Sequence, residues 1–445
     1  MNKTRQVWIW SVTVALGGFL FGFDTAVISG AEQAIQHVWQ LSDFEHGLAV
    51  AIALYGTVLG ALVGGIPADR FGRKKTLFWI AALYLISALG SAIAPDLYTF
   101  MIFRLLGGLG VGASSVVAPM YISEIAPASR RGKLVALFQF NIVLGIVIAY
   151  LSNYLLAGVN ESAWRWMLGI EAVPALVFLL AVLQVPRSPR WLITRHNNIE
   201  EARQVFETID PETAEIELDN IRSAKAVRSP GLLFFLTATQ YRRPLMLAFL
   251  FALFNQLSGI NAIIYYAPRI FNLTGLGTSS SLLSTAGMGL VNLVFTLLGM
   301  FLIDKLGRKT LMYFGSVGLL VSLSIISYAF YAEQFAIVPA AIFGFIAFFA
   351  LSQGAVIWVF ISEIFPNEVR ALGVSLGAFT HWLLAAIVAN VFPYFVTNYD
   401  PAFIFICFSL MMLLQLIYVW LMMPETKGRS LEAMNTEKVP IGLTG

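Results

Sequence analysis

The chain has 445 residues, of which 58% are hydrophobic and only 12% are charged, and its net charge is +3. Soluble globular chains are about a quarter charged, so this chain has too little polar surface to cover a particle in water. The composition excludes a set of soluble domains and predicts a membrane protein built from helices of about 20 residues. The small basic excess lies mostly in loops and gives no sign of nucleic-acid binding, and a single cysteine excludes a disulfide framework.

Twelve apolar segments, separated by charged or Gly/Pro-containing breaks, follow one another along the chain. Hydrocarbon offers no partner to an open backbone, so each segment is predicted to be a membrane-spanning helix. The first contains no small-residue cleavage site and is interpreted as a retained span. The predicted limits are 8–30, 47–67, 76–94, 98–121, 133–156, 166–185, 244–272, 280–303, 310–330, 336–362, 371–396 and 402–423.

Lysine and arginine gather in the loops after the even-numbered segments, as in 70–75, 130–133 and 305–309. They are nearly absent from the loops after the odd-numbered segments. The positive-inside rule then predicts that both termini lie in the cytoplasm. The expected localisation is that of a multi-pass integral protein of the lipid bilayer.

Two loop motifs occur twice at a nearly constant spacing. "ADRFGRKKTL" at 68–77 returns as "IDKLGRKTLM" at 303–312, and "ISEIAPASRRGKL" at 122–134 returns as "ISEIFPNEVRALG" at 361–373. We therefore expect two parallel six-helix repeats, with a site between them that opens to each side in turn. The predicted divisions are an N-terminal bundle (1–186), a cytoplasmic linker with short helices (187–243), a C-terminal bundle (244–424) and a cytoplasmic tail (425–445).

Three ionisable residues lie well inside predicted spans: Asp24 in the first, Arg104 in the fourth and Glu171 in the sixth. An intramembrane charge costs on the order of 2.5–3.5 kcal/mol by insertion scales, so these side chains should face the bundle interior and partner one another. An Asp24–Arg104 pair either only holds the first half together or couples the protein to protons. In the second case the apolar setting favours the protonated form of the Asp24 carboxyl, whereas Arg104 favours its ionised form. A movement of Arg104 would then load or release a proton.

The repeated loops also place acidic residues near basic ones. In each half we expect the loop aspartate to pair with an arginine of the later loop, and the later glutamate to join the arginine after the glycine. Such networks can stabilise one conformation of a protein that alternates between two. The alternative is that these charges only set the orientation of the chain in the membrane. The expected network consists of Asp69, Arg73, Glu124 and Arg131 (with Arg130), and of Asp304, Arg308, Glu363 and Arg370.

Four segments carry a family resemblance. They are Gly65-x-x-x-Asp69-Arg70-x-Gly72-Arg73-Lys74, "PMYISEIAPASRRGKL" (119–134), "NQLSGINAIIYYAP" (255–268) and "PETKGR" (424–429). Through them the whole chain resembles the sugar porter family of the major facilitator superfamily, and within it the bacterial xylose and hexose–proton symporters. The resemblance implies the twelve-helix major facilitator fold and monosaccharide transport. It also implies proton symport, since coupled members carry aspartate at the position of Asp24 and uncoupled ones asparagine.

Family matching further implies a sugar site between the two halves. Amides supply both hydrogen-bond roles without a charge to desolvate, and an indole can stack on the C–H face of a sugar. For an isolated amide the alternative role is a bond between helices. The implied site contains Gln139, Asn255, Gln256, Asn261, Asn292, Trp358, His381 and Trp382.

Several positions depart from the family pattern. Asn255 replaces a glutamine, and His381 stands where relatives have glutamine or asparagine, which leaves the identity of the sugar open and brings in a residue that can titrate. The segment 352–358 lacks the usual proline, so the hinge of the tenth helix is expected at Gly354. Arg187 replaces a glutamate and is expected to weaken a cytoplasmic latch.

The expected function is therefore monosaccharide transport coupled to proton symport in a bacterial inner membrane. No enzymatic activity, metal or cofactor is expected, and the partners are a sugar, a proton and the bilayer. A facilitative uniporter, a sugar sensor and a drug antiporter are the alternatives. The short tail after Pro424 disfavours the sensor, and the neutral amides of the seventh segment disfavour the antiporter.

Overall fold

The computed structural model describes residues 3–127, 130–223, 231–366 and 368–427. Within these ranges twelve helical segments are long and apolar enough to cross a membrane. This confirms the all-α membrane fold and the number of spans predicted from hydropathy. Residues 428–445, most of the predicted tail, lie outside the described part of the chain.

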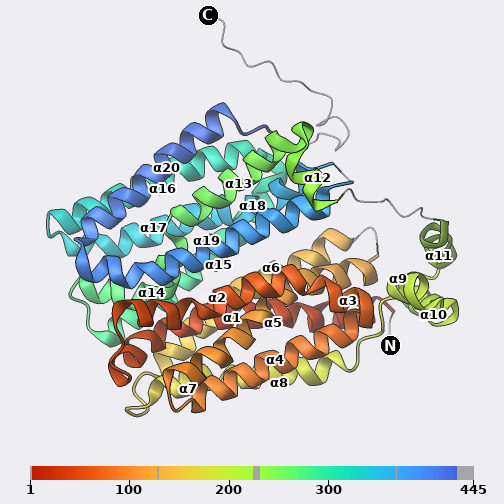
Figure 1. Cartoon of the computed structure of the whole chain (residues 1–445), viewed down its shortest axis with the longest axis horizontal. Helices are drawn as coiled ribbons and strands as arrows, with labels where there is room; N and C mark the ends of the chain where they lie inside the picture. The colour runs from red at the N-terminus through yellow and green to blue at the C-terminus, as the bar shows by residue number, and fades with distance from the viewer. Residues whose placement is uncertain (1–2, 128–129, 224–230, 367, 428–445) are drawn as a thin grey trace, which may run out of the picture.

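The first half of the chain forms one bundle, in the lower part of Figure 1. Its first helix is longer than predicted, because it continues past Gly30 to Val38 and so includes Glu32. The elements are α1 (Lys3–Val38), α2 (Asp43–Val63), α3 (Gly65–Phe71), α4 (Arg73–Ile93), α5 (Leu97–Ile125), α6 (Arg131–Leu156), α7 (Ala163–Gly169) and α8 (Ala172–Val182).

A connector of short helices follows; its first part contacts the first bundle, and its last two elements, α12 and η3, pack against the second (Figure 1). Its residues Trp191, Leu192 and Phe206 form part of a small apolar cluster of their own. The indole Nε1 of Trp191 donates a hydrogen bond to the carbonyl of Asp69 at 2.9 Å. The elements are α9 (Pro189–Trp191), the π-helical turn η2 (Leu192–His196), α10 (Ile199–Ile209), α11 (Ala214–Ser223), α12 (Leu232–Thr237) and the 3₁₀ turn η3 (Thr239–Tyr241).

The second half forms the upper bundle of Figure 1. Each half has a sharp turn at the glycine that begins its Gly-Arg-Lys motif, since Gly72 has φ 89° and Gly307 has φ 91°. This shared turn is the structural counterpart of the sequence repeat. The elements are α13 (Arg242–Leu257), α14 (Ile260–Leu273), α15 (Thr278–Leu306), α16 (Arg308–Tyr331), the 3₁₀ turn η4 (Phe335–Ile337), α17 (Val338–Leu351), α18 (Gln353–Glu363), α19 (Arg370–Asn398) and α20 (Pro401–Leu421).

Three spans are interrupted near their middle. In the sixth, a short turn at Ile170 and Glu171 separates α7 from α8, although both residues keep φ and ψ in the α region. The seventh breaks between α13 and α14 at Gly259, whose φ of 83° suits only glycine without strain. The tenth breaks at Ser352, with φ −115° and ψ −86°. The expected hinge at Gly354 is therefore wrong, since that residue lies inside α18. Gly315 of α16 makes room for the break, because a Cβ there would lie 1.8 Å from Ser352 Oγ.

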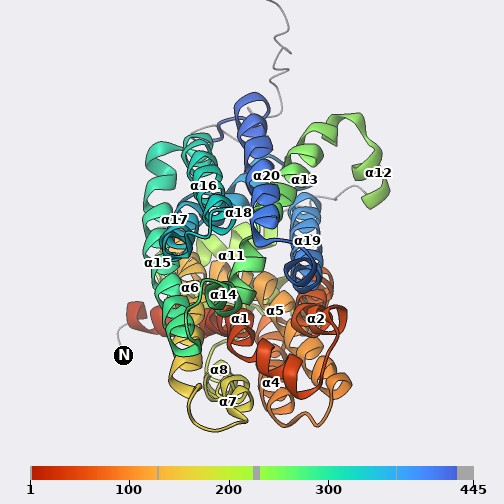
Figure 2. The same ribbon diagram turned by 90° about the vertical axis from the view of Figure 1, so that its left-hand side faces the viewer.

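The two ends of the molecule differ. We call the end that carries residues 69–75 and 304–309 the basic end, and the end that carries residues 32–46, 266–272 and 390–400 the opposite end. Figure 2 views the molecule from the opposite end, where helices of the two bundles meet. The most extensive contacts between the bundles are those of α1 with α14, α2 with α19 and α6 with α15.

Candidate functional site

Asp24 and Arg104 lie in contact inside the first bundle, on α1 and α5. Their exposed fractions are 2% and 1%. Arg104 Nη1 donates to Asp24 Oδ1, and Nη2 donates to the backbone carbonyl of Asp24 at 3.2 Å. A buried charge needs such a partner, since an isolated one would lose its hydration without compensation. The bidentate contact fixes the guanidinium to both the side chain and the backbone of α1.

Glu171 stands at the break between α7 and α8, beside this pair. It is 2% exposed, and its charge interacts with those of Asp24 and Arg104. Among the described residues its Oε1 has no hydrogen-bond partner. The cluster thus contains two carboxyl groups and one guanidinium, so it is electrically neutral only when it holds one proton. In an apolar interior the neutral form is strongly preferred.

The amides implied as sugar ligands flank the break of the seventh span. Gln256 is their centre: its Nε2 donates to Asn255 Oδ1 at 2.9 Å, and its Oε1 accepts from Asn261 Nδ2 at 2.6 Å. α13 ends at Leu257, and Gly259 is the N-cap residue that lets α14 start in a new direction. Residues on both sides of the interruption therefore reach one point, which an unbroken helix would not allow.

Three aromatic rings border these amides. A ring nitrogen of His381 lies 3.1 Å from Gln256 Nε2, and the His381 ring centroid is 5.0 Å from that of Trp358 and 4.7 Å from that of Trp382. From the other bundle, the Phe21 ring lies 5.5 Å from that of Trp382. Phe21 was missed by the sequence analysis because an aromatic side chain in an apolar span carries no signal of its own.

Two implied sugar ligands stand apart from this cluster. Gln139 on α6 and Asn292 on α15 are both half-buried. Asn292 accepts a hydrogen bond from Thr296 at 3.3 Å. No hydrogen bond or ring contact among the described residues joins either amide to Gln256. Six of the eight implied residues are thus brought together, and all six belong to the second bundle.

At the basic end, each half has an arginine that binds two carboxylates. Arg73 donates to Glu124 through Nε (3.0 Å) and Nη2 (2.9 Å), and to Asp69 through Nη1 (2.9 Å). Ser188 of the connector donates to the same glutamate at 2.5 Å. The first-half network therefore ties α3, α4 and α5 to the connector.

The second half repeats this arrangement. Arg308 donates to Glu363 through Nε (3.0 Å) and Nη2 (2.7 Å), and to Asp304 through Nη1 (3.1 Å). Thr426 donates to Glu363 at 2.6 Å, in the role that Ser188 has in the first half. Each network lies within one bundle.

Two expected pairings are wrong. Asp69 pairs with Arg73 rather than with Arg131, which is exposed. Asp304 likewise pairs with Arg308, and Arg370 keeps Nε and Nη2 without a hydrogen-bond partner among the described residues. The reason is the glycine turn between the two helices: in each half it places the arginine that starts the second helix beside the aspartate near the end of the first. Arg187 pairs with Glu201 of the connector at 2.9 Å.

Glu425 closes the second network from the end of the chain described here. Its carboxylate accepts hydrogen bonds from the backbone N–H groups of Arg308, Lys309, Thr426 and Lys427 at 2.9–3.0 Å. Burial by itself raises the pKa of Glu425, but the combined donors outweigh it and lower the pKa below the ordinary value of 4.5. The carboxylate therefore fastens the segment after α20 to the start of α16.

At the opposite end the bundles are joined by polar contacts. Arg269 of α14 donates to Glu32 of α1 at 3.1 Å and also to Gln36. Tyr150 donates to the Ile264 carbonyl at 2.9 Å. The sequence analysis missed Glu32, because it ended the first span at residue 30. The mixture of polar and apolar residues in "AEQAIQHV" (31–38), with no glycine or proline, is the signal that could have extended it.

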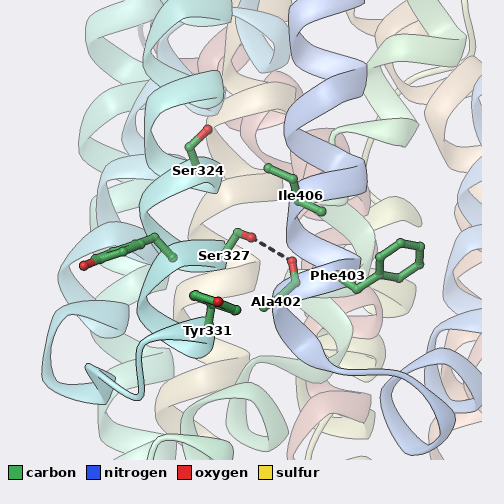
Figure 3. Close-up of a pocket in the computed structure, with 7 residues that line it drawn as sticks. Ser324, Ser327, Tyr331, Ala402, Phe403 and Ile406 are labelled. Atoms are coloured by element: carbon green, nitrogen blue, oxygen red, sulfur yellow. Dashed lines mark hydrogen bonds between the residues drawn. The ribbon is translucent and has the colours of Figure 1, made fainter.

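A hollow of about 350 Å³ lies on the outer face of the second bundle, between α16 and α20 (Figure 3). Ser327 Oγ donates to the Ala402 carbonyl at 2.7 Å, so its hydroxyl is already satisfied. Tyr331 and Phe403 are exposed there, at 80% and 53%. This surface is apolar and faces away from the amide cluster, so it is no part of the candidate site.

Comparison with known proteins agrees with this architecture. The family described as "Sugar (and other) transporter" matches residues 10–437. The arabinose-proton symporter of Bacillus subtilis is 38% identical, covering 95% of this chain and 93% of its own. The D-xylose-proton symporter of Escherichia coli K12 is 36% identical, covering 97% and 96%. A partially occluded inward-open structure of the xylose transporter XylE from E. coli has a TM-score of 0.85 at 33% identity, covering 96% and 100%.

Twelve spans, two bundles and an amide cluster at a broken helix define a membrane transporter of the major facilitator fold. The chain belongs to the sugar transporter family, and it is accordingly a transporter rather than an enzyme.

Proposed function

We propose that this protein carries a monosaccharide, a pentose or a hexose, across a bacterial inner membrane together with a proton. The observation that supports proton coupling is the count of charges around Asp24. Two buried carboxyl groups share the one guanidinium of Arg104, so the cluster needs one proton to be neutral. A site that must hold a proton in an apolar interior is suited to coupling.

The sugar is proposed to bind at the amide and aromatic cluster around Gln256. The six clustered residues present amide donors and acceptors on one side and indole rings on the other, as a sugar with hydroxyls and C–H faces requires. Phe21 brings the first bundle to within 5.5 Å of Trp382. A ligand held there would therefore touch both bundles. Gln139 and Asn292 are proposed to reach the sugar only when the bundles move.

The basic end is proposed to face the cytoplasm, so that both termini lie inside the cell. With this orientation the described state is open inward, because the polar contacts between the bundles gather at the opposite end. Arg370 at the basic end has two side-chain nitrogens without a hydrogen-bond partner among the described residues, which supports an open basic end. The arginine networks of the basic end are proposed to reach across the bundles when that end closes. The connector 187–243 would join the two bundles during the motion.

The Asp24→Asn variant tests the proposal. We expect it to lose uphill accumulation of sugar driven by an imposed proton gradient, while exchange of labelled sugar across proteoliposome membranes continues. The amide keeps a partner for Arg104 but cannot carry the proton. Asp400→Asn is the matched control, since that aspartate caps α20 in a loop and lies far from Arg104. Wild-type protein that equilibrates sugar without accumulating it would instead identify a facilitative uniporter.

A further inference from the structure

The opposite end holds a buried charged cluster that the proposed coupling site does not use. Glu32 of α1 and His46 of α2 are both 0% exposed. From the other bundle, Arg269 donates to Glu32 Oε1 through Nε at 3.3 Å and to Oε2 through Nη2 at 3.1 Å. His46 Nε2 lies 2.7 Å from the same Oε2. One carboxylate thus stands between a guanidinium of the second bundle and an imidazole of its own bundle.

Charge balance indicates the protonation of this closed cluster. The ionised Glu32 and Arg269 already cancel, so a protonated His46 would leave a net positive charge in a buried site, which is costly. Glu32 and Arg269 therefore need no charge on His46 while they are in contact. Neither ring nitrogen of His46 has a partner in hydrogen-bond geometry among the described residues, although Nε2 lies 2.7 Å from Glu32 Oε2.

Few other charged groups face His46. From α14, the Tyr266 ring meets it edge to face at 5.9 Å. The charged residues of α5 form ion pairs with other residues, Arg104 with Asp24 and Glu124 with Arg73. On α19, His381 lies at Gln256 and Arg370 at the basic end. On α2 itself, Asp43 accepts from Thr397 and Glu45 caps the helix start. His46 and Arg269 are therefore the two groups that can balance Glu32.

We propose that Arg269 and His46 compete for Glu32, so that opening of this end is linked to protonation of His46. The inference rests on the alternating movement of the two bundles proposed above. When the bundles part, Arg269 leaves with the second one and Glu32 is left in the first. An unpaired carboxylate in that position is costly, and a protonated His46 at 2.7 Å supplies the missing positive charge. The open form thus binds a proton that the closed form does not.

The sign of the pH response follows from this difference. Protons stabilise whichever state binds more of them, so acid favours the form that is open at the opposite end. If that end faces the outside, an acidic exterior shifts the transporter toward the outward-open form, which can load sugar. His46 then acts on the conformational equilibrium and not on the sugar.

Spin labels can measure the opening directly. Cysteines replace Asn160 and Ser279, which are exposed at the opposite end on different bundles, and Cys407→Ser removes the native thiol. Distances are measured without sugar in nanodiscs between pH 8 and pH 5.5. The Asp24→Asn background keeps the other proton site from contributing. His46→Gln and Glu32→Gln are the test variants, and His37→Gln is the matched control, an exposed histidine at the same end.

We expect the ratio of open to closed forms to rise about tenfold over this pH range with His46 present. His46→Gln should abolish the rise, Glu32→Gln should abolish it and open this end at every pH, and His37→Gln should retain it. An unchanged pH response in His46→Gln, or closure of this end in acid, would overturn the proposal. If His46→Gln does not fold, a pH response that survives in Glu32→Gln would also overturn the proposal. Sugar accumulation by wild-type protein tests the symport function separately, because these distances involve no transport.

Discussion

At the scale of the residue, Gln256 does most to define the candidate sugar site. It is 1% exposed and contacts Asn255, Asn261 and His381 through both ends of its amide. The break of the seventh span sets where these amides lie, because Asn255 and Gln256 come before it and Asn261 comes after it. A sugar hydroxyl that enters this ring of amides exchanges one hydrogen bond for another, so binding costs little desolvation.

Gln256→Ala is expected to weaken sugar binding at least several-fold while the protein stays folded. The change leaves Asn261 and His381 without their shared partner, and losing a buried hydrogen-bonding group costs roughly 1–3 kcal/mol. Titration calorimetry with a panel of pentoses and hexoses measures the effect. Gln415→Ala is the control: that amide is also buried and bonds Gln353 at 2.8 Å, but it belongs to another cluster. Equal loss of affinity in both variants would contradict the assignment.

At the scale of the element, the interrupted helices position the chemistry. Gly259 and Ser352 stand where a span leaves the helical conformation, and Glu171 stands at the short turn between α7 and α8. The freed backbone groups need partners that a continuous helix would supply itself. Hydropathy averaged over a whole span shows none of these breaks, because the few polar residues beside them do not outweigh the apolar ones. The positive φ at Gly259 and the non-helical φ and ψ at Ser352 are properties of the folded structure.

Gly259→Ala is expected to lower the melting temperature and to weaken sugar binding several-fold. The added Cβ would lie 2.6 Å from the Phe408 ring, in addition to the strain of φ 83°, which costs about 1 kcal/mol or more. Gly275→Ala is the matched control, since Gly275 has φ 84° and open space around it. It should lose stability but not affinity. If Gly275→Ala weakens binding as much as Gly259→Ala, the contact with Phe408 is not what matters.

Glu425 gives an element-scale prediction for pH. Its pKa in the folded protein is below 4.5, so the stability it adds is present above pH 4.5 and is lost as the pH falls through the lowered value. Glu425→Gln should reduce the melting temperature by a few degrees at pH 7. The difference from wild type should shrink as the pH approaches 4. Glu161→Gln, an exposed loop residue, should show no such difference at either pH.

At the scale of the whole molecule, the sequence predicted the twelve spans and the all-α fold, and the motif repeats predicted that both halves share one arrangement. It did not predict which partners the loop charges take: Arg73 and Arg308, just after the glycine turns, pair with the aspartates in place of Arg131 and Arg370. Nor did it predict Glu32 and His46, because their meeting depends on how α1 and α2 pack against the second bundle. The local sequence pattern determines the secondary-structure elements, whereas the contacts between the bundles depend on the conformational state.

The closest approach between bundles offers a test of that state. A Cβ on Gly47 of α2 would lie 1.8 Å from the Asn390 carbonyl oxygen of α19. Gly47→Leu should therefore prevent the opposite end from closing, because backbone cannot yield as a flexible side chain can. We expect sugar to bind while exchange across proteoliposome membranes falls at least tenfold, since one half of the cycle is blocked. Gly277→Leu, with nothing within 4 Å at the same end, should exchange normally. Unimpaired exchange by Gly47→Leu would show that the bundles do not have to meet at α2 and α19 for sugar to cross.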